Sequence, residues 1–212
     1  MEDYYRERAP YYDRVYLYPE RANDIAFLKS YIPPKFADLD ILEVAAGTGF
    51  WTQFIAETVS SVLATDIAQE PLNELSRREL PETVQTKIAD AFELPSLNRE
   101  FDGAFIGLWL SHVPIEKVGV FLRSLHSVLR PGAKVILIDN TNAQCQRLPI
   151  ARTDEIGNTY QNRELDDGSV HEVLKNFPRK EDLLEYVSNI ADLPKYQELE
   201  HFWLFEYESK AH

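Results

Sequence analysis

Short apolar segments that suit β-strands alternate with helical segments between residues 38 and 140. The strand candidates are Asp40–Val44, Val62–Thr65, Val84–Ala89, Phe101–Leu108 and Lys134–Ile138. Helices are expected near residues 50–58, 71–79 and 114–129, and a turn at 130–132. Because strand–helix–strand units join parallel strands through right-handed crossovers, this order predicts an α/β fold with a mostly parallel sheet and helices on both faces.

The segments that flank this core have a different character. Before it, apolar residues from Glu20 to Ile32 suit one face of a helix, which Pro33 and Pro34 would end. After it, residues 163–165 and 170–175 flank Asp166-Asp167-Gly168, which is favourable hairpin-turn chemistry. The sequence therefore predicts an N-terminal helical lid and an inserted β-hairpin.

The last part of the chain predicts a helix near residues 180–190 and two aromatic-rich strands, 196–201 and 203–208, that form an antiparallel pair at the sheet edge. The sheet would then have seven strands. We expect a single domain with four parts: a lid (1–36), a cofactor-binding core (38–140), a substrate flap (141–178), and a final helix with edge strands (179–212).

Composition limits the partners of such a domain. The formal net charge of −13 disfavours nucleic acid and anionic membranes, whose phosphates would meet a like-signed surface. No apolar run approaches the roughly 20 residues that cross a bilayer, and the charged N-terminus does not resemble a signal peptide. Cys145 is the single cysteine. We expect a cytoplasmic monomer or homodimer that acts on a small molecule without a metal.

The loop that follows the first strand lies in the segment ILEVAAGTGFWT, residues 41–52. Gly47 and Gly49 would let a nucleotide approach the main chain where the strand turns into a helix. A dinucleotide site prefers a small residue at the position of Thr52, and the carboxylate of Glu43 would repel a pyrophosphate. The loop therefore favours a cationic nucleoside ligand, with a nicotinamide-dependent oxidoreductase as an alternative.

Acidic residues also end the next two strands. Asp66, in ATDIA, could accept both hydroxyl hydrogens of a ribose. Asp90, in KIADAFELP, could accept from an adenine amino group, with Ala91 and Phe92 beside it. Either acid alone could cap a helix, but three acids after successive strands favour a nucleoside site.

The motifs ILEVAAGTG, ATDIA and IADAFELP resemble those of class I S-adenosylmethionine (SAM)-dependent methyltransferases, and FDGAFIGLWLSHV and RPGAKVILID resemble the family's next two strands. The resemblance spans residues 38–140 and implies a Rossmann-like fold, SAM as cofactor and S-adenosylhomocysteine (SAH) as product. Ala45 stands where the family usually has glycine. The expected cofactor-binding residues are Tyr12, Glu43, Ala45, Gly47, Trp51, Asp66, Ile67, Asp90, Ala91, Phe92 and Leu108.

A further resemblance runs through YYRERAPYYD, GTGFWT, WLSHVP and RELDDGSVHEVLKNF, which are similar to small O-methyltransferases that act on phosphonates. It supports an anion site formed by Arg163 and Lys175 on opposite arms of the hairpin, although both could be ordinary surface residues. His112 could deprotonate a substrate hydroxyl or be a structural histidine. The expected substrate-binding residues are Tyr16, Tyr18, Trp109, Arg163 and Lys175, with His112 as the catalytic residue.

Aromatic residues near the expected site allow two interpretations. The N-terminal tyrosines could cover the cofactor as a lid, with Tyr12 facing the sulfonium, or could pack a helix against the sheet. Trp51 and Trp109 could line the crevice or fill the core.

The favoured function is O-methylation of a small anionic metabolite such as a carboxylate or phosphonate. A non-catalytic SAM-binding module is the main alternative. Base methylation of nucleic acid is disfavoured because LWLSHVP lacks the Asn/Asp-Pro-Pro-aromatic motif of amino-methylating enzymes.

Overall fold

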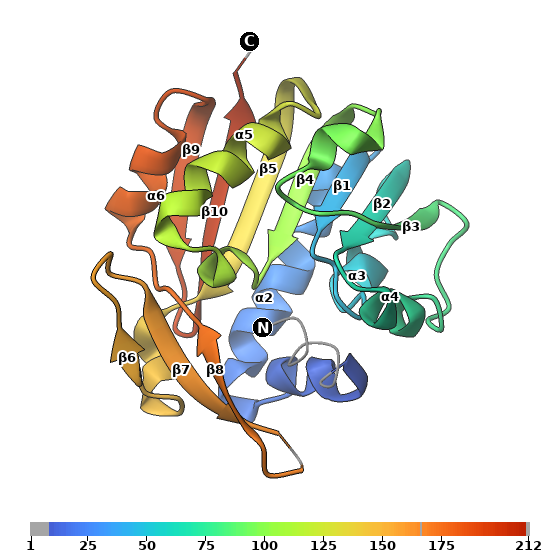
Figure 1. The fold of residues 1–212 in the computed structure, drawn as a ribbon. Helices are drawn as coiled ribbons and strands as arrows, with labels where there is room; N and C mark the ends of the chain where they lie inside the picture. Colours follow the sequence, from blue (N-terminus) through green and yellow to red (C-terminus); the bar gives the residue numbers. More distant parts are fainter. Residues whose placement is uncertain (1–8, 166, 211–212) are drawn as a thin grey trace.

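The computed structural model describes residues 9–165 and 167–210, with side chains in the first helix described from Asp13 onward. Its main sheet consists of β1 (Asp40–Val44), β2 (Ser61–Asp66), β3 (Val84–Ile88), β4 (Phe101–Gly107), β5 (Leu129–Asn140), β9 (Ala191–Glu198) and β10 (Phe202–Ser209). The strand order is β3-β2-β1-β4-β5-β10-β9, and β10 runs antiparallel to both neighbours (Figure 1). The predicted seven-stranded, mostly parallel sheet with an antiparallel C-terminal pair is confirmed.

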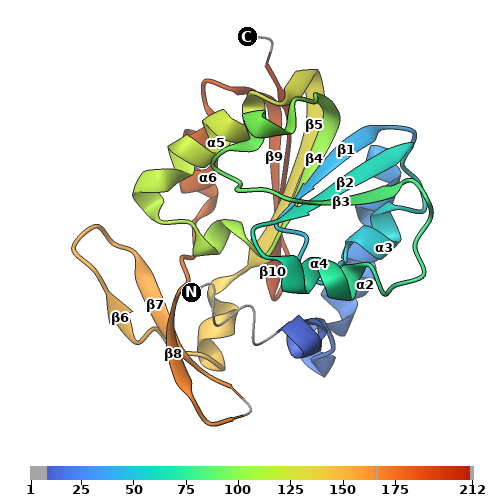
Figure 2. The same ribbon diagram turned by 45° about the vertical axis from the view of Figure 1, so that its right-hand side comes forward.

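Helices cover both faces of this sheet (Figure 2). On one face lie α5 (Val118–His126) and α6 (Lys180–Val187), and on the other α2 (Ala22–Tyr31), α3 (Thr52–Ile55) and α4 (Gln69–Leu75). Successive side chains of a strand point to opposite faces of the sheet, which explains why helices pack on both faces. In β1, Leu42 and Val44 belong to the core that contains α5 and α6, whereas Ile41 belongs to the core under α2 and α3.

Two local predictions differ from the structure. The helix expected near 50–58 is shorter, since α3 covers only Thr52–Ile55 and turns flank it. After α3 the chain also makes tertiary contacts: the Thr58 hydroxyl donates to Pro33 O (2.8 Å), and Asp38 N donates to Thr58 O (2.9 Å). The turn expected at 130–132 is an irregular part of β5, where the register with β4 shifts and Arg130 O accepts from the Ser209 hydroxyl (2.7 Å).

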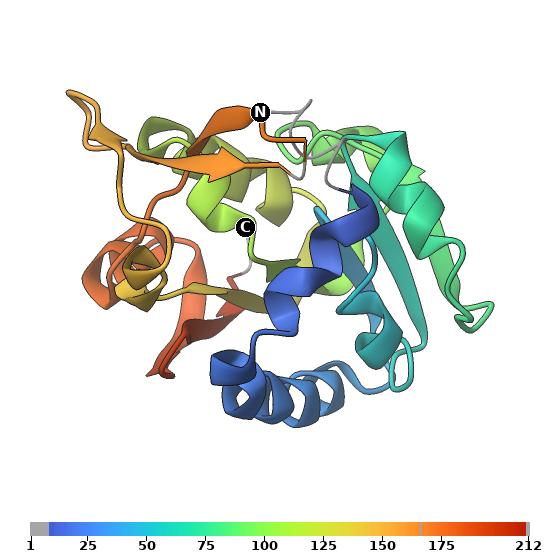
Figure 3. The ribbon, with the colours of Figure 1, turned by 90° about the horizontal axis from the view of Figure 1, so that it is seen from below.

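Two additions lie at the carboxyl ends of the parallel strands (Figures 1 and 3). The N-terminal one contains the 3₁₀ helices η1 (Ala9–Tyr16) and η2 (Pro19–Arg21) ahead of α2. The other is a three-stranded sheet of β6 (Arg152–Thr153), β7 (Thr159–Glu164) and β8 (Val170–Leu174). The predicted hairpin is therefore confirmed as β7–β8, and β6 extends it.

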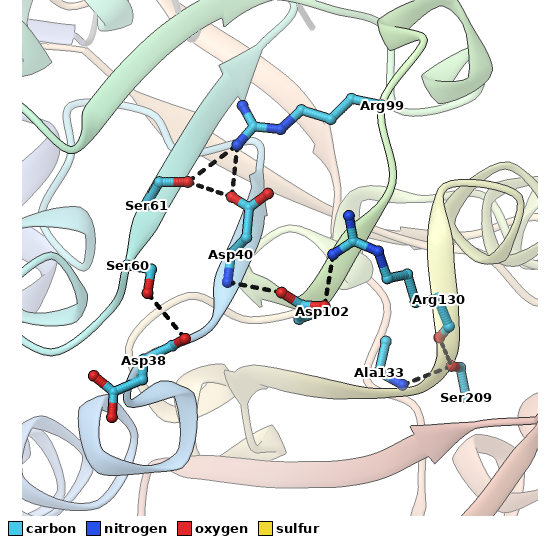
Figure 4. A network of polar contacts seen from close by, with 9 residues as sticks. All are labelled: Asp38, Asp40, Ser60, Ser61, Arg99, Asp102, Arg130, Ala133 and Ser209. Atoms are coloured by element: carbon cyan, nitrogen blue, oxygen red, sulfur yellow. Dashed lines mark hydrogen bonds and ion pairs between the residues drawn. The ribbon is translucent and has the colours of Figure 1, made fainter.

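A polar network holds the amino ends of the strands, away from these additions (Figure 4). Arg99 pairs with Asp40 (2.6 Å), Asp40 N donates to Asp102 (3.2 Å), and Arg130 pairs with Asp102 (2.6 Å). The Ser209 hydroxyl connects β10 to the start of β5. These contacts hold the amino ends of neighbouring strands together. The two additions lie at the opposite, carboxyl ends of the strands, where a site can form.

Candidate cofactor and acceptor site

A cavity of ≈ 390 Å³ opens at the carboxyl ends of β1 and β2, where β4 also ends. This is the edge at which open parallel sheets bind ligands, and the volume suits a nucleoside-sized molecule. The cavity gathers nine of the residues singled out from the sequence. Its lining is Val44, Ala45, Gly47, Asp66, Ile67, Ala68, Pro71, Ala89, Asp90, Ala91, Phe92, Trp109, His112 and Lys117.

The glycine loop bends sharply beside this cavity. Gly47 and Gly49 have φ of +57° and +78°, and a Cβ added to Gly49 would lie 2.6 Å from Leu75 Cγ. Only glycine meets both requirements without strain. Ala45 also has a positive φ of 54°, which is costly for a residue with a side chain. The loop therefore brings bare backbone to the cavity wall.

Asp66 and Asp90 both face the cavity and both shape the local backbone. The Asp66 carboxylate accepts from Gly47 N (3.0 Å) and Ala68 N (3.1 Å), and burial raises its pKa despite these bonds. Asp90 accepts from Phe92 N (2.8 Å). Next to Asp66, Ile67 is 50% exposed and offers an apolar surface at the rim. This combination of fixed acceptors and apolar contact suits a ribose and a purine.

Glu43 lies beneath the cavity and does not line it. Its side chain is buried on the same face as Ile41, where Thr52 Oγ1 donates to the carboxyl group (2.7 Å). Burial raises the pKa of Glu43 to about 8. The acid thus supports the first turn of α3 from inside the protein.

Four other predicted residues lie away from the cavity. Trp51 and Leu108 are buried in the core, and Tyr16 stacks on Phe50 with ring centroids 3.7 Å apart. Tyr18 is half-buried, with Arg147 lying 3.9 Å from its ring centroid. The Tyr12 side chain is outside the described residues. In the described part of the N-terminal segment, Tyr16 thus packs a helix against the core.

His112 lines the cavity from the 3₁₀ helix η5 (Leu110–His112). Its Nδ1 lies 2.6 Å from Leu174 O at the end of β8. Because a carbonyl oxygen only accepts, Nδ1 carries the hydrogen, and in the neutral ring Nε2 is the atom that can take a proton. This contact joins the cavity to the inserted sheet.

Lys175, the residue after Leu174, lies in a buried polar network. Its Nζ donates to Asp139 Oδ1 (2.7 Å), Ser111 Oγ (2.7 Å) and Asn140 Oδ1 (3.1 Å). Asp139 is the second-to-last residue of β5 and also accepts from Ser111 N (3.0 Å). Burial lowers the pKa of Lys175 to about 8, although Asp139 opposes the shift. Lys175 follows Leu174 in the chain, and its contact Ser111 precedes His112. The ammonium is therefore held close to the contact between His112 and Leu174.

Two arginines complete this group, which we call the cation cluster: Arg21, Arg163 and Lys175. Their side chains are only 4%, 7% and 1% exposed. Both arginines lie close enough to Lys175 to disfavour its charged form. Arg21 Nη1 donates to Val15 O (2.9 Å), while its Nε has no hydrogen-bond acceptor among the described residues. Asp139, a buried acid, pairs with Lys175 of this cluster (2.7 Å).

Sequence reasoning missed Arg21, Asp139 and Lys117. Arg21 could have been found, because it precedes Ile25 by four residues and Leu28 by seven and so shares the buried face of α2. Asp139 lies near the carboxyl end of a strand, as Asp66 does. Lys117 is an exposed residue at the cavity rim, and nothing in its sequence context distinguishes it.

No group of three or more metal-ligating side chains occurs within residues 9–165 and 167–210. Over the same residues, no helix is long and apolar enough to cross a membrane.

Comparison with known proteins indicates the family that this fold resembles. Residues 41–132 match a family model described as a methyltransferase domain. DhpI in complex with SAH superposes with a TM-score of 0.81 at 25% identity, covering 99% of this chain and 95% of DhpI. The chain carries a methyltransferase domain and shares the fold of the class I SAM-dependent methyltransferases. A second DhpI structure, with SAM and HEP, gives a TM-score of 0.77 at 26% identity.

Curated relatives cover the core of this methyltransferase. The biotin biosynthesis bifunctional protein BioHC of Cellvibrio japonicus is 30% identical over 115 residues, and a demethylmenaquinone methyltransferase of Staphylococcus aureus is 31% identical over 105 residues. These matches span 53% and 47% of this chain, but only 22% and 42% of the relatives. They support the shared cofactor core rather than a common acceptor.

The residues of the cavity fit SAM, the cofactor of this family. Asp66 would offer carboxylate oxygens to ribose hydroxyls, Asp90 would offer an acceptor to the adenine amino group, and Ile67 and Phe92 would offer apolar surface. Trp109 closes the wall next to His112, and its ring packs against Phe121 at 4.8 Å between centroids.

Proposed function

We propose that this protein transfers the methyl group of SAM to an oxygen atom of a small anionic acceptor, a carboxylate or a phosphonate. The observation that carries the proposal is the cation cluster, the buried group of Arg21, Arg163 and Lys175. The similarity to DhpI, whose structure contains SAM and HEP, supports it.

Cations that are removed from water attract anions strongly, because little solvent screens their charge. Arg21, Arg163 and Lys175 are all buried in a protein whose net charge is −13, and Lys175 pairs with Asp139 (2.7 Å). An acceptor with an anionic group would be attracted to these cations and would gain charge-assisted hydrogen bonds. A neutral acceptor would gain neither.

The cluster also has a suitable place for this role. His112 contacts Leu174, which precedes Lys175 in the chain. Lys175 contacts Ser111, which precedes His112. His112 lines the cofactor cavity, so an acceptor anchored at the cluster would have its reacting end at His112 and Trp109. We propose that Arg163 and Arg21 bind the anion, that the Lys175 ammonium attracts it through its charge, and that Trp109 and Tyr18 form the walls.

When bound, SAM supplies a methyl carbon that its sulfonium activates for in-line displacement. The protein aligns the acceptor oxygen with that carbon and excludes water. If the oxygen belongs to a hydroxyl, we propose that Nε2 of His112 takes the proton while Leu174 O fixes the ring. If the oxygen is already ionised, no base is needed, and the cation cluster alone positions it.

A methyl-transfer assay with organic acids, phosphonates and their uncharged analogues tests this proposal. Anionic acceptors should turn over, and Arg163→Gln should raise the acceptor KM about tenfold or more with little effect on cofactor affinity. Arg152→Gln is a matched control, because Arg152 lies in the same inserted sheet but pairs with Glu172 at the surface.

Two results would contradict the proposal. Equal turnover of charged and uncharged acceptors would remove the role of the cation cluster. SAM binding without turnover of any acceptor would favour the non-catalytic binding module.

A further inference from the structure

Asp13 in η1 takes part in a three-residue network with the glycine loop and the end of α4. Thr48 Oγ1 donates to Asp13 Oδ1 (2.7 Å), and the guanidinium of Arg78 pairs with the other oxygen of Asp13. Arg78 Nε also donates to Thr48 O (2.6 Å). We call Asp13, Thr48 and Arg78 the loop latch. Each member bonds to the other two, although they lie far apart in the sequence.

The loop latch acts on the backbone that forms the cofactor cavity. Thr48 lies between Gly47 and Gly49 and is only 5% exposed. Gly47 lines the cavity, and its amide donates to Asp66. Two glycines with positive φ give this loop more conformational freedom than other residues would, so contacts to the loop must hold its shape.

A second contact places η1 over the same loop. Tyr16, at the end of η1, stacks on Phe50 with an angle of 8° between the rings. Asp13 and Tyr16 therefore hold the chain on both sides of Gly49. The chemistry proposed for the acceptor uses neither Asp13 nor Arg78.

We propose that Asp13 and Arg78 are positioning residues that act through Thr48, holding η1 on the glycine loop so that the cofactor is retained. Release of the product SAH then requires the loop latch to open. This inference rests on the proposed function only in taking SAM and SAH as the ligands.

Exposure explains why such a network can open. The Arg78 and Asp13 side chains are 23% and 36% exposed, whereas Lys175 and Asp139 are 1% and 0% exposed. Water and salt can compete for the charges of the loop latch, but not for the buried pair. The loop latch is thus a reversible contact that depends on ionic strength.

Dissociation of SAH, measured by stopped-flow mixing and checked by calorimetry, tests the inference. Thr48→Val removes the hydroxyl at nearly constant volume and should speed dissociation about tenfold, the loss expected for one charge-assisted hydrogen bond. Thr48→Ser keeps the hydroxyl and should stay within about twofold of the original rate. Neither substitution should change the acceptor KM at saturating SAM.

A pair of adjacent arginines provides a second test. Arg78→Gln should speed dissociation about as much as Thr48→Val, because it breaks two contacts of the loop latch. Arg77→Gln is the control, since Arg77 pairs with Glu74 at the surface and has no contact with the loop latch. Salt at ~0.5 M should speed dissociation from the unmodified protein and from Arg77→Gln, but should have little effect on Arg78→Gln.

Equal dissociation rates for Thr48→Val and Thr48→Ser, or for Arg78→Gln and Arg77→Gln, would overturn the inference. These rates need no acceptor, so they separate the loop latch from the proposed function. A protein that transfers no methyl group can still show the loop latch, and an active methyltransferase can still lack it.

Discussion

The buried carboxyl group of Glu43 should make the free energy of unfolding fall as the pH rises. Its pKa is raised from 4.5 to about 8 in the folded protein. Between these values the folded chain holds a proton that the unfolded chain releases. Stability from this group is therefore complete below pH 4.5 and is lost as the pH rises toward 8. At pH 7, about 2.5 above the ordinary value, the loss is about 3 kcal/mol.

Glu43→Gln should abolish this dependence, because an amide is neutral throughout the range. The amide oxygen can still accept from the Thr52 hydroxyl, but its NH₂ group would be buried without a partner, at a cost of about 1–2 kcal/mol. The variant should be less stable than the original protein near pH 5 and more stable at pH 8. The two stability curves should cross at about pH 5.5.

Urea denaturation at several pH values between 5 and 8 measures these curves. Glu57→Gln is the control, because Glu57 is exposed shortly after α3 and its substitution should leave the pH profile unchanged. Parallel profiles for Glu43→Gln and the unmodified protein would refute the reasoning, since they would show that Glu43 is ionised in the fold.

Two further substitutions separate the cofactor cavity from the cation cluster. Asp66→Ala should weaken SAH binding in calorimetry by about tenfold or more and leave the acceptor KM nearly unchanged, because its carboxylate faces the cavity and holds the Gly47 amide. Equal losses for both ligands would contradict that division. Asp139→Asn should lower the free energy of unfolding by about 3–5 kcal/mol, because it removes the buried counter-ion of Lys175. Asp102→Asn, at a surface pair with Arg130, should cost under about 1 kcal/mol, and a similar loss in both variants would argue against the buried charge.

The fold of the core could be predicted from the sequence because its signals are local. Apolar strands alternate with helices, so the parallel direction of the first five strands followed from residues 38–140 alone, whereas their order in the sheet did not. The hairpin followed from a turn motif and its flanking strands. Predictions failed where tertiary contacts decided the outcome, as at the start of β5, where the expected turn is part of a strand and Arg130 O accepts from the Ser209 hydroxyl.

The candidate site was predictable to a similar extent. Residues that follow strands, such as Asp66 and Asp90, are brought together by topology, and the structure places both at one cavity. Trp51 and Leu108 follow the same rule but point into the core. The direction in which a side chain points is set by packing against neighbouring elements. The spacing of residues along one element does not specify that packing.

The sequence by itself determined the parallel core and the glycine loop, because strand alternation and the backbone freedom of glycine are local properties. Only the tertiary structure decided which charges are buried. Arg21, Asp139, Arg163 and Lys175 come from four separate segments, and their effect depends on the shared removal of water around them. Burial changes both the strength of an ion pair and the pKa of its members, so the chemistry of this site arises from packing rather than from any one motif.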